Sequence, residues 1–245
     1  AVIMEPVGVV EPEDSFLEEV KDITHENGAL LIFDEIITGF RLSLGGAQEY
    51  YKVIPDLACF GKAMANGMPI SAVVGRREIM EIFEEIFFSF TFGGEVLSLA
   101  ASIATINEIK GKDVIKHIWR LGRILKDGYN ELSKKHGLES YTSCIGLPPR
   151  TVITFTPHIS ISAGFKDAQG NESLEMKTLF QQETIKRGIL FSGSQNICYS
   201  HSDEDIDYTL KVYDEAFKVL SRAIEDGDFM KYIEGEIVQP VFRKA

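Results

Sequence analysis

The stretch LLIFDEIITGF, residues 30–40, joins a run of apolar residues to two adjacent carboxylates, Asp34 and Glu35. A run of this kind is typical of a strand that is buried in a parallel sheet. A carboxylate at the end of a buried strand is poorly solvated unless a positive group lies close to it. The stretch therefore predicts a buried strand that ends at Asp34, and it indicates a cationic partner for that carboxylate.

The first part of the chain alternates between strand patterns and helix patterns. Helical patterns cover residues 13–27 and begin again at about residue 76, whereas apolar, strand-like segments lie at residues 2–4, 29–33, 57–60 and 70–75. This alternation predicts an α/β sheet with mostly parallel strands. Ligands of such sheets bind beyond the carboxyl ends of the strands. Asp34 and Lys62 both follow predicted strands, so we expect both at that edge.

The second part of the chain has a different pattern. We expect a mainly helical region over 95–136, a strand over 150–157, a loop over 158–173, and helices over 174–187 and from 203 to about 225. A domain boundary within a long helix would make residues 1–125 part of a large domain and residues 126–245 a small carboxy-terminal domain. The chain begins with AVIMEPV, inside a strand-like run and without an initiator methionine, so we expect it to be the carboxy-terminal portion of a longer protein.

Composition excludes some classes of function. The net charge of −12 argues against a nucleic-acid-binding surface and gives no reason for attraction to an anionic membrane. We find no signal peptide and no apolar run of membrane-spanning length, so we expect a cytoplasmic protein. The three cysteines are widely spaced and form no metal-binding pattern, which favours reduced, buried thiols.

Asp34 and Glu35 have one interpretation as the acidic pair of a magnesium-dependent ATPase. That interpretation requires a phosphate-binding loop of the form GxxxxGK[ST]. Gly61 and Lys62 are the closest match, but Asp56 stands where the first glycine is needed and Ala63 replaces the Ser or Thr. The chain therefore lacks the phosphate loop that this interpretation needs.

A second interpretation uses Asp34 and Lys62 together. Lys62 lies between an apolar strand and a turn rich in Gly and Asn, where we expect it to be desolvated. A desolvated lysine loses its proton more readily and attacks carbonyl carbons as a neutral amine. Pyridoxal phosphate needs such a lysine, and it needs an acid beside its pyridine nitrogen. The TFGG turn at 91–94 precedes an Ala/Leu-rich helix and offers donors for the phosphate.

Three motifs occur in an order that resembles a known family. They are ALLIFDEIITGFR, PDLACFGKAMANGMPISAVVGRREIM and TFGG, and together they resemble class III pyridoxal-phosphate-dependent aminotransferases. GGAQEYYKVIPDL and GRREIM are most similar to the glutamate-1-semialdehyde 2,1-aminomutase branch. The resemblance is strong over residues 28–102 and weaker in the second half of the chain. It implies a type I fold, with part of a large domain built on a mainly parallel sheet and a smaller α+β carboxy-terminal domain.

The resemblance also implies roles by position. Lys62 matches the Schiff-base lysine, and Asp34 matches the acid at the pyridine nitrogen. Ile36 matches the aliphatic residue on the ring face, and Glu5 matches the family's EP position beside the site. Thr91 matches the threonine that reaches the phosphate of the partner subunit's cofactor. The implied activity is ping-pong amino transfer between a small-molecule amino donor and a carbonyl acceptor, carried out by a homodimer without metal.

Several positions depart from the aminomutase pattern and leave the substrate open. Glu95 and Val96 replace an Asn-Pro pair, and Ile197 replaces an acidic residue. An aminotransferase that acts on another amino compound and an aminomutase both remain as interpretations. The family's phosphate-binding turn and its ring-stacking aromatic residue lie upstream of Ala1. An inactive interaction module that retains the fold is therefore a third interpretation.

Overall fold

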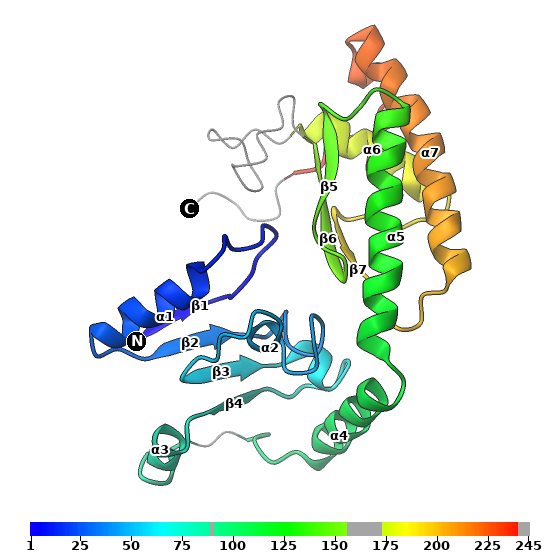
Figure 1. The fold of residues 1–245 in the computed structure, drawn as a ribbon. Helices are drawn as coiled ribbons and strands as arrows, with labels where there is room; N and C mark the ends of the chain where they lie inside the picture. The colour runs from blue at the N-terminus through cyan, green and yellow to red at the C-terminus, as the bar shows by residue number, and fades with distance from the viewer. Residues whose placement is uncertain (89–90, 156–172, 240–245) are drawn as a thin grey trace. The chain divides into compact units, whose positions relative to one another are not determined.

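The computed structural model describes residues 1–88, 91–155 and 173–239, and the chain divides into two compact units, residues 1–117 and 118–245 (Figure 1). The expected assignment of residues 1–125 to a cofactor-binding domain and of 126–245 to a small domain stays a prediction about roles. Most of the loop that we expect at 158–173 lies outside the described residues.

The first unit is built on a four-stranded sheet. Its strands, in spatial order, are β1 (Val2–Met4), β2 (Leu31–Asp34), β3 (Leu57–Phe60) and β4 (Ala72–Gly75). β2 runs parallel to both β1 and β3, as the apolar runs predict. β4 is antiparallel to β3, because the connection between them holds only a short 3-10 helix, η1 (Lys62–Met64), and a turn.

One helix, α1 (Phe16–Glu26), packs a buried residue against strand β2 of this sheet. Leu17 of α1 packs with Leu31 and Phe33 of β2 and with Val53, all buried. The remaining helices are α2 (Ala47–Tyr50), α3 (Arg77–Met80), the 3-10 helix η2 (Glu81–Glu84) and α4 (Val96–Gly111). One core cluster therefore lies between α1 and β2, and a second, which contains Ala58, Phe60 and Met64, lies around β3 and η1.

A buried carboxylate, Asp56, ties several of these elements together. Its Oδ2 accepts a hydrogen bond from Leu31 N at 2.8 Å and lies 2.8 Å from His25 Nε2. Its Oδ1 accepts from an Arg76 guanidinium nitrogen at 3.0 Å. Burial alone would raise the pKa of Asp56, but the hydrogen bonds from Leu31, His25 and Arg76 outweigh it and lower the pKa to about 2. The native state thus favours the charged carboxylate.

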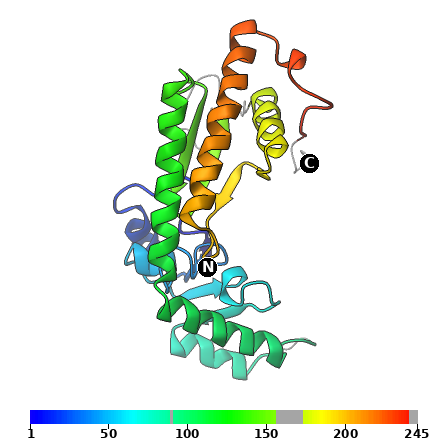
Figure 2. The same ribbon diagram turned by 90° about the vertical axis from the view of Figure 1, so that its right-hand side faces the viewer.

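The second unit is an antiparallel sheet with helices on one side (Figures 1 and 2). The strands are β5 (Thr142–Leu147), β6 (Arg150–Phe155) and β7 (Ser194–Asn196), in that spatial order. The helices are α5 (Val114–Lys135), α6 (Leu174–Lys186) and α7 (Asp203–Asp226), followed by the 3-10 helix η4 (Phe229–Lys231). Helices α5 and α7 run side by side over the sheet in both views.

Aromatic side chains fill the core of the second unit. The ring of Phe180, on α6, lies between 5.2 and 5.9 Å from the rings of Tyr129, Tyr213 and Phe217. All four side chains are almost fully buried. Tilted and edge-to-face pairs of this kind add to the free energy gained from area burial. The α5, α6 and α7 helices therefore share one aromatic centre.

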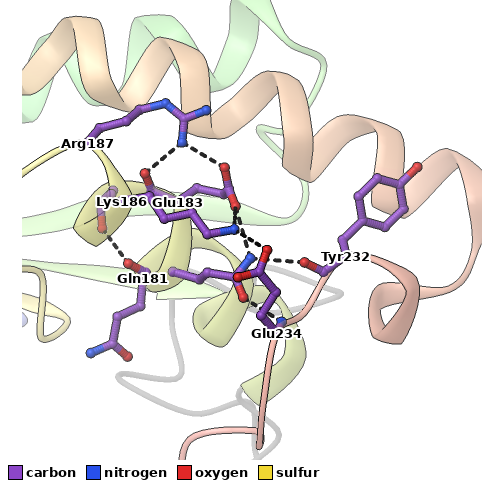
Figure 3. A network of polar contacts seen from close by, with 8 residues as sticks. Gln181, Glu183, Lys186, Arg187, Tyr232 and Glu234 are labelled. Atoms are coloured by element: carbon purple, nitrogen blue, oxygen red, sulfur yellow. Dashed lines mark hydrogen bonds and ion pairs between the residues drawn. The ribbon is translucent and has the colours of Figure 1, made fainter.

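A polar network joins α6 to the segment that follows α7 (Figure 3). The buried Glu183 carboxylate accepts hydrogen bonds from Gln182 at 3.0 Å and from Arg187 at 2.7 Å. Lys186 pairs with Glu234 at 2.7 Å, and Glu234 N donates to Gln182 Oε1 at 2.6 Å. The chain after α7 is thus fixed to the end of α6 by side chains that α6 itself presents.

Some features differ from the sequence-based expectations. The predicted helical region 95–136 is two helices, because Asp113 between them has a left-handed φ of 51°. β5 and β7 were not predicted. Cys144 is buried as expected, but Cys198 is exposed and Cys59 is partly exposed, so the expectation of buried thiols is wrong for Cys198. In the part of the chain that the structure describes, no helix is long and apolar enough to cross a membrane.

We predict that Asp56→Asn lowers the free energy of unfolding by about 2 kcal/mol at pH 7, because the amide cannot replace a charged acceptor for three donors. The native pKa is lowered, so the contribution of Asp56 is complete above its ordinary pKa of 3.8 and is lost as the pH falls toward 2. Urea unfolding at pH 7 and at pH 3 measures both effects.

The control is Asp22→Asn, since Asp22 is exposed on the same α1 helix. It should change stability little at either pH. Equal stability of the Asp56 and Asp22 variants at pH 7 would contradict the anchoring role of Asp56.

Candidate functional site

The carboxyl ends of three parallel strands meet at one edge of the first unit's sheet. Glu5 follows β1 directly, Asp34 is the last residue of β2, and Lys62 lies two residues after β3. The register keeps these positions close, because Met4 pairs with Phe33 and Asp34 pairs with Cys59. Three of the predicted site residues therefore lie along the same edge, where α/β sheets bind ligands.

Asp34 is half-buried at this edge. Its Oδ1 accepts a hydrogen bond from Ile36 N at 3.0 Å, which fixes the carboxylate against the first turn of the following loop. The neighbouring Cys59 thiol has a raised pKa, first because of burial and second because of the negative charge of Asp34. Asp34 thus presents a negative charge in a place with restricted solvent, which favours a cationic ligand.

Lys62 has an unusual backbone conformation. Its φ of 42° lies in the left-handed region, which L-residues other than Asn and Asp seldom occupy. Such conformations cost of order 1–3 kcal/mol and gather at functional sites. The side chain is exposed in the structure, so the expectation that the strand and turn around Lys62 desolvate it is wrong. The nearby residues Gly61 and Met64 are buried, whereas Lys62 between them is exposed.

Ile36 connects the Asp34 and Lys62 segments. A Cβ placed on Gly61 would lie 3.8 Å from Ile36 Cγ2, so the Ile36 side chain packs against the residue before Lys62. The structure therefore brings Asp34, Ile36 and Lys62 together from two neighbouring strands. Glu5 is exposed on the third strand of the edge.

Thr91 is not brought to this group. It is exposed in the turn before α4, and no hydrogen bond within the described residues joins it to Asp34 or Lys62. Glu95 is the N-cap of α4, and its carboxylate accepts hydrogen bonds from Leu97 N at 2.6 Å and Ser98 N at 2.8 Å. A carboxylate already occupies these donors at the start of α4, and hydrogen bonds from Ser98 and then Leu97 lower its pKa.

Glu35 is a site-adjacent residue whose environment the sequence did not reveal. It is fully buried, whereas Asp34 and Ile36 on either side are half-buried. The signal that was available is the position of an acidic residue directly after a buried strand, where a carboxylate must find donors.

Comparisons with known proteins identify the family to which the chain belongs. A family model described as aminotransferase class-III matches residues 1–142. The chain therefore belongs to the class III aminotransferase family. Because the matched region contains Asp34 and Glu35, the family match displaces the ATPase interpretation of this pair.

Curated relatives and solved structures agree with this assignment. Proteins named glutamate-1-semialdehyde 2,1-aminomutase from Alkaliphilus oremlandii and Methanocaldococcus jannaschii are 38% and 36% identical over 91% and 89% of this chain. The chain spans about half the length of these relatives, 53% in both cases.

The solved structures show the fold. The PLP internal aldimine form of Sphingopyxis FumI superposes with a TM-score of 0.79 at 23% identity, over 91% of this chain and 52% of FumI. An omega-transaminase from Sphaerobacter thermophilus gives 0.79 at 22% identity, with the same coverage of both chains. The type I fold of pyridoxal-phosphate-dependent transferases, expected from the resemblance, is thus confirmed for this portion.

Proposed function

We propose that the protein containing this chain is a pyridoxal-phosphate-dependent aminotransferase that binds its cofactor through Lys62, with Asp34 at the pyridine nitrogen. The observation that carries the proposal is the gathering of Asp34, Ile36 and Lys62 at the carboxyl edge of β2 and β3. Membership of the class III family supports it.

The residues present suit this cofactor. When bound, pyridoxal phosphate supplies an aldehyde that takes up amino groups and a protonated ring that withdraws electrons. Asp34 suits a cationic ring nitrogen, because its carboxylate is half-buried and held by Ile36 N. Ile36 offers an aliphatic surface beside it. Glu5 follows β1, which lies on the other side of β2 from β3, and we assign it a position beside the site rather than a chemical step.

Lys62 has two tasks in this proposal. Its Nζ would hold the cofactor. As a free, neutral amine the same Nζ would accept the proton of the substrate carbon, and as an ammonium it would then donate that proton to the cofactor's aldehyde carbon. The left-handed backbone at Lys62 supports such a role, because strained conformations persist where function requires a fixed side-chain origin. The Asp34 carboxylate would accept a hydrogen bond from the protonated ring nitrogen and so favour the protonated ring, which stabilises negative charge that develops on the substrate carbon.

A second candidate is a glutamate-1-semialdehyde 2,1-aminomutase, the name that both curated relatives carry. We favour an aminotransferase with another small-molecule amino donor and carbonyl acceptor, because Ile197 replaces an acidic residue of the aminomutase pattern. Ile197 is 3% exposed, so this position contributes to packing. We also propose a cytoplasmic location, which three free cysteines support.

We further propose that the complete protein is a homodimer in which Thr91 serves the partner's cofactor phosphate. The support is the surface of α4 and the turn before it. Ser98 and Ser102 are the buried residues of α4, whereas large apolar side chains point outward. The most exposed are Phe87 at 95%, Phe92 at 77% and Val96 at 75%. Aromatic side chains of this kind are enriched in interfaces, and a second copy would cover them.

The first prediction from this proposal concerns attachment. Borohydride reduction of the complete protein loaded with pyridoxal phosphate should leave a stable adduct on the peptide that contains Lys62, as read by mass spectrometry. Lys62→Ala should give no adduct there, whereas Lys52→Ala, a change of another lysine in the same unit, should leave it intact. An equal adduct in the Lys62 variant would refute the assignment.

The second concerns Asp34. Asp34→Ala should bind cofactor through Lys62 yet lose amino transfer by at least about 100-fold, because nothing then holds a proton at the ring nitrogen. Single-turnover kinetics with the adduct assay as a loading control measure this effect. Turnover within a few-fold of the native protein would exclude the role.

The third concerns assembly. Thr91→Ala should weaken cofactor retention without unfolding either subunit, so the melting temperature of the cofactor-free protein should stay unchanged. Mixed dimers of Lys62→Ala and Thr91→Ala subunits should contain one site with both groups intact and recover about a quarter of native activity at statistical mixing. A monodisperse monomer with full cofactor occupancy would contradict the shared site.

A further inference from the structure

We infer that Glu35 is a positioning residue, which sets the orientation of Asp34 and Ile36 by holding the loop after β2 from its buried side. This inference rests on the proposed function of Asp34. It concerns how the chain keeps a half-buried carboxylate fixed at the sheet edge, which the pairing of the strands does not by itself determine.

The backbone at Glu35 is the last point at which the sheet fixes the chain. Glu35 N donates to Cys59 O at 2.9 Å and thereby extends the β2–β3 ladder by one residue beyond Asp34. Side chains alternate between the two sides of an extended segment. Glu35 is 0% exposed, whereas Asp34, the last residue of β2, is half-buried, so the Glu35 side chain lies on the side of the strand opposite Asp34.

The Glu35 carboxylate binds both ends of the loop that follows. Oε2 accepts hydrogen bonds from the Thr38 hydroxyl and from Ala47 N, the latter at 2.8 Å. Oε1 accepts from Gln48 N at 2.7 Å. Thr38 lies in the first turn of the loop, whereas Ala47 and Gln48 begin α2. One buried side chain therefore closes a loop of about a dozen residues onto the end of β2.

The packing around this carboxylate leaves little freedom. A Cβ on Gly46 would lie 2.3 Å from Glu35 Oε2, and Gly46 has a left-handed φ of 86°. A Cβ on Gly39 would lie 2.7 Å from the backbone carbonyl oxygen of Glu35. The same oxygen accepts a hydrogen bond from Gly39 N at 2.8 Å. The two glycines let the loop approach Glu35 so closely that its carboxylate and carbonyl are both enclosed.

The link to the site runs through Ile36. Ile36 N holds Asp34 Oδ1 at 3.0 Å, and the Ile36 side chain packs against Gly61, the residue before Lys62. A shift of the loop moves Ile36 N and hence the Asp34 carboxylate. Misplacement of a catalytic group by about 1 Å can cost about 100-fold in rate, so the buried side of the loop affects the reaction.

The test compares Glu35→Gln with one matched control and one milder perturbation in the complete protein. Both Glu35 oxygens accept from backbone N–H groups, and the amide NH2 of glutamine would face one of these donors. The matched control is Glu183→Gln, since Glu183 is likewise buried with several donors but lies in the second unit. Thr38→Val, paired with Thr38→Ser, is the milder perturbation of the same carboxylate.

We expect Glu35→Gln to lower kcat by about 10- to 100-fold and to weaken pyridoxal phosphate binding, measured by absorbance titration. Hydrogen exchange of the cofactor-free variant should speed up in residues 36–48. Glu183→Gln should lower the melting temperature but leave kcat and cofactor binding unchanged. Should Glu35→Gln not fold, Thr38→Val decides, with a smaller loss of kcat that Thr38→Ser does not share.

Two outcomes separate this inference from the proposed function. If the native protein forms no adduct at Lys62, the proposed function fails and Glu35 loses its assigned role with it. If the adduct forms and Glu35→Gln speeds exchange in the loop while kcat and cofactor binding stay within twofold of native values, Glu35 only holds the loop. That result would overturn the positioning role.

Discussion

The parallel pairing of β2 with β1 and β3 is the constraint on which the first unit depends. Parallel strands begin and end at the same edges, so residues far apart in the sequence, such as Asp34 and Lys62, are placed together by backbone hydrogen bonds alone. Such strands must be buried, which explains why the segment before Asp34 is a continuous apolar run. The same burial raises the free-energy cost of a charged side chain at the strand end. Such a side chain therefore needs a partner of opposite charge or several hydrogen-bond donors.

Two buried carboxylates fix β2 at its opposite ends. Asp56 accepts from Leu31 N where the strand begins, and Glu35 accepts from the loop where it ends. Each is satisfied by several donors, as buried charges need to be. Asp34 differs from both, because it is half-buried and its bound oxygen is held by Ile36 N. Among these three carboxylates, Asp34 is the one whose surroundings suit a ligand rather than a structural contact.

The sequence predicted those strands whose residues are apolar and whose neighbours in the chain are turn residues. The strands at 2–4, 57–60 and near Asp34 are apolar runs bounded by turn residues, and their positions were predicted closely. β7 was not predicted, because Ser194, Gln195 and Asn196 are polar and owe their strand conformation to pairing with β6. The break at Asp113 was missed although Gly111, the last residue of α4, lies two positions before it. The partners of Glu35 come from 12 and 13 residues further along the chain, beyond any local pattern.

Among the residues that the structure describes, Lys62 is exposed, which separates two requirements of the proposed chemistry. An amine that attaches to an aldehyde acts in its neutral form, which burial favours over water. The described residues hold the backbone of Lys62 in a strained conformation and place it beside Ile36 and Asp34, but they leave its side chain exposed. Geometry and desolvation are therefore separate requirements here. In the proposed function, β2, β3 and their loops would meet the first requirement, and the bound cofactor, by covering the Lys62 amine, would meet the second.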